Sequence, residues 1–313
     1  MSTIHSIGGY QVSDQVLAAV QEASQRTGID FAYMMAKAAQ ESAFQPTAVA
    51  GSTNATGLYQ FIDSTWLAMI KENGATYGLG QYADRITVRQ DGSLAVTDAA
   101  ARREILALRE DPRLNAIMAG EYALDNREYL ERNVGGRIGS TELYLAHFLG
   151  AGGATTFLRQ LRHDPDQTAA SVFPAAARYN YNVFYNSNTG QPRSLQQVYD
   201  WMDRRMQQGI ATMGGVPSTG AYAGTGTEAP LRPMVTAPHF AAARSVTAIP
   251  QASAYTAMHP GAALGQRLAA LSGAAAGSGP TPAGGTSLSL WTLLTASALP
   301  VPGDAGGELP GAA

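Results

Sequence analysis

The sequence of 313 residues contains no cysteine, so disulfides and thiolate metal sites are both excluded. Charged residues make up only 14% of the chain, the net charge is −3, and no run of Lys or Arg occurs. This charge balance lacks the basic footprint of a nucleic-acid-binding protein. No stretch of about 18 apolar residues is present, so a membrane-spanning helix is not expected.

Two further signals are missing. The segment 1–9 has neither a basic stretch nor an apolar core, so no secretory signal peptide is visible. No Gly-rich phosphate loop follows a predicted strand, and no cluster of His and carboxylate residues has ligand spacing. We therefore expect no metal and no cofactor. The histidines are scattered along the chain: His5, His147, His163, His239 and His259.

Composition changes abruptly near Met213. Eleven of the sixteen prolines lie beyond it, but only six charged residues do. A segment made mostly of Ala, Gly, Thr and Ser buries too little apolar surface to offset its chain entropy. We predict a globular domain over 1–211 and a disordered, low-complexity tail over 212–313, with short helices near 262–276 and 287–299. The second of these either packs on itself or docks on a partner, such as an assembly or export machine.

Helix start and stop signals divide the region from 10 to about 210 into many short-to-medium helices. Asp91-Gly92 lies between two short β-prone runs, 86–88 and 94–96, and predicts one small hairpin. The predicted fold class is therefore mainly α, of the α+β kind, with a helical domain and one hairpin. The expected helices run over 14–26, 31–42, 63 or 64 to 73, 99–109, 112–133, 141–149, 174–181 and 195–208. Gly150 and the pair Gly152-Gly153 are expected to break the helix after 149, and a further helix then runs to about 162. Ser194 and Gln197 predict a capping box at the start of the last helix.

Glu41 lies near the end of the predicted helix 31–42, about 80° from the apolar face centred on Phe31. A carboxylate in such a place is costly unless it is paired or protonated. Partial desolvation would raise its pKa and favour the protonated form that a general acid needs. Pairing with Lys37, one turn earlier, would lower the pKa instead. The local sequence leaves both alternatives open.

Two motifs follow Glu41 at short range. Glu41 and Ser42 begin the pattern Glu-Ser-x-Phe, which a Gly/Asn-rich loop separates from 57–61, Gly-Leu-Tyr-Gln-Phe, and from 64–66, Ser-Thr-Trp. This combination resembles the lytic transglycosylases of the soluble-lytic-transglycosylase type, which have a lysozyme-like fold. The resemblance covers roughly residues 30–185. It implies that Glu41 is the single catalytic acid/base, and that a glycan cleft is lined by Ser42, Gly57, Leu58 and Gln60. The family usually has Met where this chain has Tyr59, whose ring either stacks on a sugar or packs in the core.

The later family motifs match less closely. Where the family usually has Ala-Tyr-Asn before Gly-rich residues, this chain has Ala146, His147 and Phe148. His147 is either a cleft residue or a structural one. A Pro-led short helix after Pro174 carries the counterpart of the family's cleft tyrosine, which is Tyr179 or Tyr181. The resemblance therefore adds His147, Phe148, Tyr179 and Tyr181 to the expected substrate-binding residues.

The activity that the resemblance implies is non-hydrolytic cleavage of peptidoglycan, at the β-1,4 bond between N-acetylmuramic acid and N-acetylglucosamine, leaving 1,6-anhydro ends. A mechanism with a single catalytic carboxylate fits this sequence, because the loop 43–62 contains no Asp or Glu, and Asp63 is better explained as a helix cap. Two alternatives stay open. One is a goose-type-like hydrolase in which Asp63 or Asp84 faces Glu41 across a water. The other is a non-catalytic peptidoglycan-binding module.

The expected partner is the glycan strand, and the expected site of action is the cell envelope. Because no signal peptide is visible, three routes there remain open: export by a flagellar or type III-like machine, delivery by a phage-type particle, and a wrongly assigned start codon.

Overall fold

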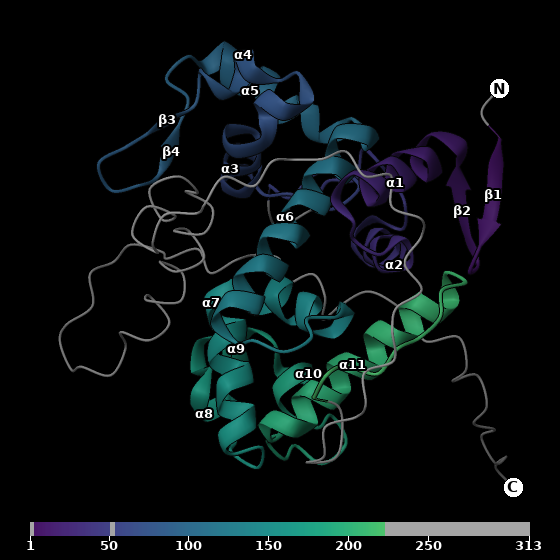
Figure 1. The fold of residues 1–313 in the computed structure, drawn as a ribbon, viewed down its shortest axis with the longest axis vertical. Coiled ribbons are helices and arrows are strands. Elements are labelled where there is room, and N and C mark those ends of the chain that lie inside the picture. Colours follow the sequence, from purple (N-terminus) through teal and green to yellow (C-terminus); the bar gives the residue numbers. More distant parts are fainter. Residues whose placement is uncertain (1–2, 51–53, 223–313) are drawn as a thin grey trace, which may run out of the picture.

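The N-terminal hairpin begins the part of the chain that the computed structural model describes, which is residues 3–50 and 54–222 (Figure 1). Strands β1 (Ile4–Ile7) and β2 (Tyr10–Ser13) pair antiparallel, with Ile7 opposite Tyr10. Gly8 and Gly9 form the turn at φ 57° and 84°, values that favour glycine. We had not predicted this hairpin, although a Gly-Gly pair between two short strands is a known hairpin signal.

Two capped helices follow it, as predicted. Helix α1 (Asp14–Thr27) is capped by Ser13 and ends at Gly28, which has a left-handed φ of 68°. Helix α2 (Phe31–Ser42) starts at Asp30, whose carboxylate accepts from Tyr33 N at 2.7 Å. Residues 32–39 of α2 are all buried, because α1 packs on one side and α11 on another.

The predicted second hairpin belongs to a small lobe at the upper left of Figure 1. This lobe contains α3 (Asp63–Asn73), a 3₁₀ turn (Gly74–Tyr77), α4 (Gly80–Ala83), β3 (Thr87–Val88), β4 (Leu94–Ala95), α5 (Ala99–Ala107) and a second 3₁₀ turn (Leu108–Glu110). Trp66 is fully buried in it and donates from Nε1 to Ile105 O at 2.7 Å. Within the described residues, β3–β4 and β1–β2 are the two sheets.

Asp63 does not cap α3, contrary to our expectation. Ile62 is the N-cap residue and makes no side-chain capping bond. The Asp63 carboxylate instead pairs with Arg102 at 2.5 Å and with Arg109 at 2.9 Å. Capping was the wrong explanation because these arginines come from α5 and the turn after it, which no local pattern around Asp63 reveals.

Helix α6 (Pro112–Asn133) passes through the middle of the molecule and packs against both α1 and α7 (Figure 1). Asp111 caps it with Pro112 at its first position. Helix α7 (Ser140–His163) bends at Gly150, which has non-helical angles of φ 74° and ψ 160°. The break predicted at Gly150 is thus confirmed as a kink, whereas Gly152 and Gly153 stay helical.

The last helices cover the lower part of the view in Figure 1. They are α8 (Ala169–Val172), α9 (Pro174–Tyr179), α10 (Tyr181–Phe184) and α11 (Leu195–Thr212). The capping box predicted at the start of α11 is present, since Ser194 and Gln197 each accept from the other's backbone N–H. Helix α11 packs on α2 and α7, so it joins the N-terminal half to the C-terminal half.

Residues beyond α11 also pack on the domain. Gly220 N donates to Asp203 Oδ1 at 2.9 Å, and Ala221 N donates to Glu142 Oε1 at 3.1 Å. The boundary predicted at 211/212 therefore falls inside α11, and the ordered packing continues to Tyr222. The helices predicted at 262–276 and 287–299 lie outside the described residues.

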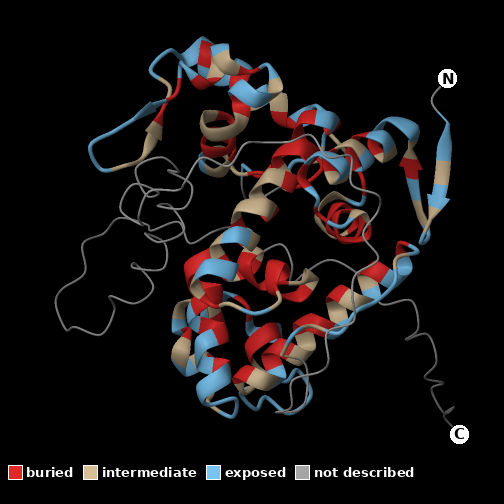
Figure 2. Cartoon of the chain, viewed as in Figure 1, coloured by how far each residue is buried: buried red, intermediate tan, exposed pale blue. Residues whose placement is uncertain are grey.

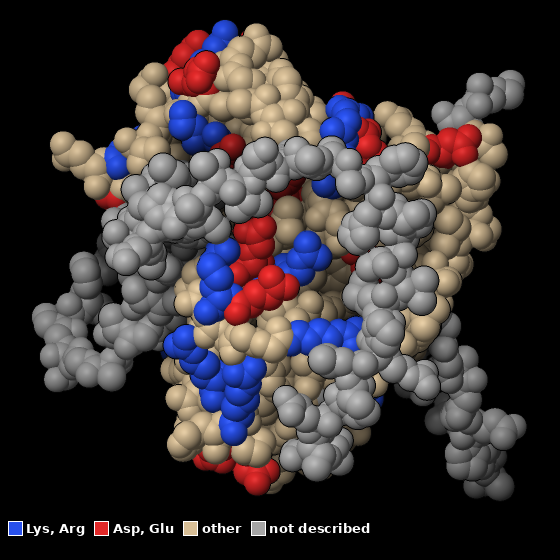
Figure 3. All heavy atoms as spheres, viewed as in Figure 1, with Lys and Arg blue, Asp and Glu red and all other residues tan. Residues whose placement is uncertain are grey.

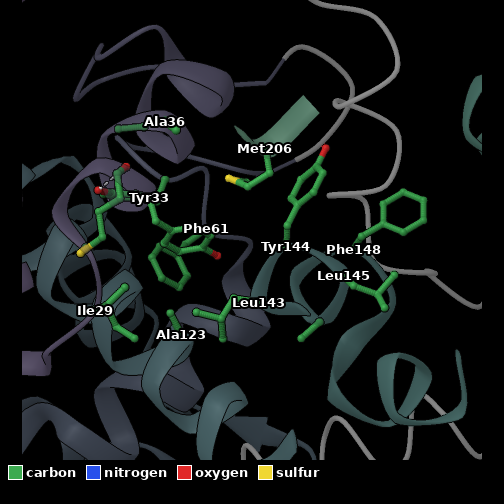
Figure 4. Close-up of a cluster of buried hydrophobic side chains, with 14 of the residues drawn as sticks. Ile29, Tyr33, Ala36, Phe61, Ala123, Leu143, Tyr144, Leu145, Phe148 and Met206 are labelled. Atoms are coloured by element: carbon green, nitrogen blue, oxygen red, sulfur yellow. Dashed lines mark hydrogen bonds between the residues drawn. The ribbon is translucent and has the colours of Figure 1, made fainter. Parts of the chain in front are cut away.

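The buried residues form one core, and Figure 2 shows the helices turning their buried faces toward each other. Figure 4 shows a central part of it, where Tyr33 of α2, Phe61 of the loop before α3 and Tyr144 of α7 lie together with Met206 of α11. The mainly helical fold class is confirmed, with the predicted hairpin present and the N-terminal one added.

Candidate active site

Glu41 lies in the last turn of α2 and is paired with Lys37. Lys37 Nζ is 2.6 Å from Glu41 Oε1, and the two side chains are only 4% and 1% exposed. The pairing follows from their i, i+4 spacing, which brings the two side chains together on one helix face. The alternative of a Lys37–Glu41 pair is therefore the one that the structure contains.

His147 meets the same carboxylate from α7. Its Nε2 lies 3.2 Å from Glu41 Oε1, and its ring packs edge-on against Tyr122 of α6, with 6.5 Å between the ring centroids. Burial, assisted by the charge of Lys37, lowers the pKa of His147, so the ring is neutral near pH 7. A neutral imidazole protonated on Nε2 can donate to the carboxylate. The structure thus brings together two residues that lie 106 positions apart in the sequence.

Lys37 and His147 together decide whether Glu41 is charged. Burial has the largest influence on the carboxyl and by itself would raise the pKa, but Lys37 and His147 outweigh it and hold the pKa at about 2. The raised pKa that we considered from the sequence is therefore wrong for the free protein. Glu41 is a carboxylate at neutral pH, ready to accept a proton.

Ser42 connects α2 to the second motif. Its hydroxyl donates to Leu58 O at 2.8 Å, across a separation of 16 residues. Gln60 has a φ of 52° and donates from Nε2 to Ala48 O and to Gly57 O, both at 2.9 Å. These bonds close the loop between α2 and α3 and hold it beside Glu41.

Glycine is needed at position 57 for two reasons. Its φ is 91°, and atoms of neighbouring residues lie where a Cβ would be. A Cβ there would lie 2.1 Å from Arg109 O and 2.4 Å from Asn115 Nδ2. Asn115 of α6 is fully buried, accepts from Tyr59 N at 2.8 Å and donates to Arg109 O at 2.7 Å. Sequence reasoning missed Asn115, although an amide inside the apolar run 114–118 is an available signal.

Three of the expected substrate-binding residues are buried by this arrangement. Leu58, Tyr59 and Gln60 are 0%, 5% and 3% exposed. The Tyr59 hydroxyl donates to Met34 O at 3.1 Å, so the alternative in which its ring packs in the core is the one observed. Direct glycan contacts by these side chains are not supported, because all three are buried and because the Tyr59 hydroxyl and Gln60 Nε2 already bond to the backbone. They position the loop instead.

The residues of the later motifs divide into buried and exposed ones. Phe148 is 5% exposed and lies in the buried cluster of Figure 4. It packs near Phe184 of α10, with ring centroids 6.3 Å apart. Tyr179 and Tyr181 are 46% and 52% exposed, and Tyr181 stacks on Tyr185 at 4.5 Å. The two exposed tyrosines are therefore available to a ligand, whereas Phe148 is part of the core.

Asp125 is a titrating carboxyl that sequence reasoning also missed. It lies on α6, and Figure 3 shows acidic side chains flanked by basic ones on the face where α6 lies in this view. Burial raises its pKa to about 7, helped by the charges of Glu72, Glu121 and Glu128. The spacing of Glu121, Asp125 and Glu128, which places them on one helix face, was the available signal.

Replacing Asp125 by Asn is expected to stabilise the protein at alkaline pH. A carboxyl whose folded pKa is raised favours the folded state at low pH, and that contribution is lost as the pH rises through about 7. The gain in unfolding free energy from Asp125→Asn should grow by about 2 to 3 kcal/mol between pH 5 and pH 8. Urea denaturation at both pH values measures it. The exposed Asp84→Asn serves as control, and an equal gain at both pH values would contradict the assignment.

In the described part of the chain, no group of His, Asp and Glu side chains is arranged to hold a metal ion. The same residues include no helix with the length and apolar character needed to span a membrane.

The comparison with known families covers the first half of this site. Residues 18–87 match the family described as the transglycosylase SLT domain. The matched region includes α2 with Glu41 and Ser42, and the turn 57–61, but it ends before His147 and the tyrosines of α9 and α10. The resemblance inferred from the first two motifs is thereby confirmed. Residues 18–87 are thus similar to the transglycosylase SLT domain, which is consistent with the lytic transglycosylase family.

Proposed function

We propose that this protein is a lytic transglycosylase that cleaves the β-1,4 bond between N-acetylmuramic acid and N-acetylglucosamine, with Glu41 as its single acid/base. The SLT domain supports action on peptidoglycan in general. The observation that carries the finer proposal is the position of Glu41, a buried carboxylate contacted by Lys37 and His147 beside the Ser42–Leu58 bond.

In the proposed reaction, protonated Glu41 gives its proton to the glycosidic oxygen, and the bond from that oxygen to C1 of the muramic acid breaks. The 2-acetamido group of the substrate stabilises the positive charge that develops at C1. Glu41, again a carboxylate, removes the proton of the C6 hydroxyl, and that oxygen closes on C1. Atoms balance without water, since the leaving sugar gains the one proton that C6–OH loses. General acid–base participation of this kind contributes roughly 10²–10⁴-fold to a rate.

A single-carboxylate route is favoured over hydrolysis because Asp63 is engaged elsewhere. A hydrolase needs a second carboxylate to activate water opposite the acid. Both oxygens of Asp63 pair with arginines, one with Arg102 and the other with Arg109. Asp84 is an exposed residue after α4, outside the elements that contact Glu41.

Product analysis tests the proposal. Purified peptidoglycan is digested with the full chain and the fragments are analysed by mass spectrometry. We expect 1,6-anhydromuramic ends, which weigh one water less than hydrolysed ends. Reducing ends would support the goose-type-like hydrolase, and binding without any cleavage would support the non-catalytic module.

The remaining expectations belong to the same proposal. The substrate would place this protein in the cell envelope, with Tyr179 and Tyr181 offering exposed rings to the glycan. The part of the predicted tail that follows Tyr222 is proposed to dock on an assembly or export machine. Fractionation of cells expressing the full chain, or a chain ending at Tyr222, measures how far the tail decides the location.

A further inference from the structure

We propose that Lys37 is a positioning residue that holds Glu41 as a carboxylate in the free enzyme and so sets the pH above which the acid step is lost. This inference rests on the proposed function, which requires Glu41 to carry a proton before the glycosidic bond breaks. It begins from the Nζ–Oε1 distance of 2.6 Å between two side chains that are almost fully removed from solvent.

The surroundings of the pair make Lys37 the deciding charge. Besides Glu41, its ammonium lies 3.5 Å from Gln40 Oε1 and 5.0 Å from the centre of the Tyr144 ring, and both groups are uncharged. A buried ammonium beside one carboxylate stabilises the ionised form of that carboxylate far more than an exposed ammonium would.

The other titratable groups that face Glu41 are neutral. His147 of α7 has a lowered pKa, and burial, together with the charge of Glu41, raises the pKa of Tyr33 on α2 far above neutral pH. Tyr122 of α6 packs against the His147 ring, and burial raises its pKa as well. Of these groups and Tyr144, none can replace the positive charge of Lys37.

Removing the charge of Lys37 is expected to change the pKa of Glu41 from lowered to raised. In Lys37→Met the unbranched side chain is one atom shorter and uncharged, and the buried carboxyl retains only the hydrogen bond of a neutral His147. Burial, the largest influence on this carboxyl, then raises its pKa above the ordinary value of 4.5. Lys37→Arg keeps the charge and serves as the conservative variant.

The titration of Glu41 can be read without any activity. The carboxyl carbons of glutamate are labelled with ¹³C in the full chain, and the Glu41 signal is identified by its loss in Glu41→Gln. We expect no inflection of that signal between pH 4 and 8 in the wild type or in Lys37→Arg, and an inflection within this range in Lys37→Met. A wild-type midpoint above pH 4, or an unchanged signal in Lys37→Met, overturns the proposal. If Lys37→Met does not fold, the wild-type titration alone decides.

The second readout is the pH dependence of kcat/KM for peptidoglycan cleavage. Between pH 5 and 7 the wild-type value should fall about 100-fold, and that of Lys37→Met should fall less, by an amount that its own ¹³C midpoint sets, since kcat/KM reports the free enzyme. Parallel profiles would overturn the role of Lys37. If the ¹³C titration behaves as expected while the wild type cleaves no glycan, the effect of Lys37 on the ionisation of Glu41 is supported. The proposed transglycosylase function is then refuted.

Discussion

Glu41→Gln should reduce the release of glycan fragments by roughly 10²–10⁴-fold, because the amide can neither donate the proton to the glycosidic oxygen nor accept one from C6–OH. Glutamine is nearly isosteric and still accepts a hydrogen bond, so contacts to His147 can persist. The rate of fragment release from purified peptidoglycan measures the loss. A matched control is Glu104→Gln on α5, an exposed residue with a side chain 58% accessible, and its rate should equal that of the wild type.

The same substitution leaves Lys37 buried without its partner, which by itself destabilises a protein by several kcal/mol. Loss of activity must therefore be separated from loss of fold. The double variant Lys37→Met/Glu41→Gln removes both charges at once, so we expect it to be more stable than Glu41→Gln and equally inactive. Thermal unfolding followed by circular dichroism compares the two. Near-normal turnover in either folded variant would refute the role of Glu41.

Gly57→Ala is expected to cause the largest loss of stability, about 3 to 5 kcal/mol. Two costs combine there. The φ of 91° is unfavourable for any residue with a Cβ, and the new methyl group would meet the Arg109 carbonyl oxygen at 2.1 Å. Neither Arg109 nor Asn115 can withdraw easily, because both are buried and hydrogen-bonded to the same loop. Urea denaturation of the two proteins measures the difference.

Gly78→Ala separates these two costs. Gly78 also has a positive φ, 78°, but a Cβ there would meet nothing within 4 Å. Its substitution should cost only about 1 to 2 kcal/mol, the conformational part alone. If Gly57→Ala and Gly78→Ala were equally destabilising, the close approach of the Gly57 turn to Arg109 would not matter for stability.

The helices were largely predictable because their boundaries are set locally. Asp30, Asp111 and Ser194 each accept a backbone N–H within three residues, so sequence neighbours are enough to reveal them. The kink at Gly150 was predictable for the same reason. The N-terminal hairpin was missed although its Gly8-Gly9 turn is just as local a signal, because its first strand, Ile-His-Ser-Ile, is not a continuous β-prone run like 86–88.

The site was predictable only where neighbours on one helix create it. Spacing put Lys37 within reach of Glu41, but the choice between pairing and protonation depended on how deeply both are buried, and that depth comes from α7 and α11. The arginines that bind Asp63 and the amide of Asn115 under the Gly57 turn are separated from their partners by tens of residues. No pattern along the chain encodes such contacts.

The segment that returns along the domain after α11 has a mechanical consequence. Because Gly220 and Ala221 bond through their backbone to Asp203 and Glu142, a pull applied at Tyr222 would reach those two buried carboxyls first, rather than unwinding the end of α11. Tyr222 adds its own anchor, since the Arg162 guanidinium lies 5.0 Å above its ring. A load applied at Tyr222 is therefore shared by α7 and α11.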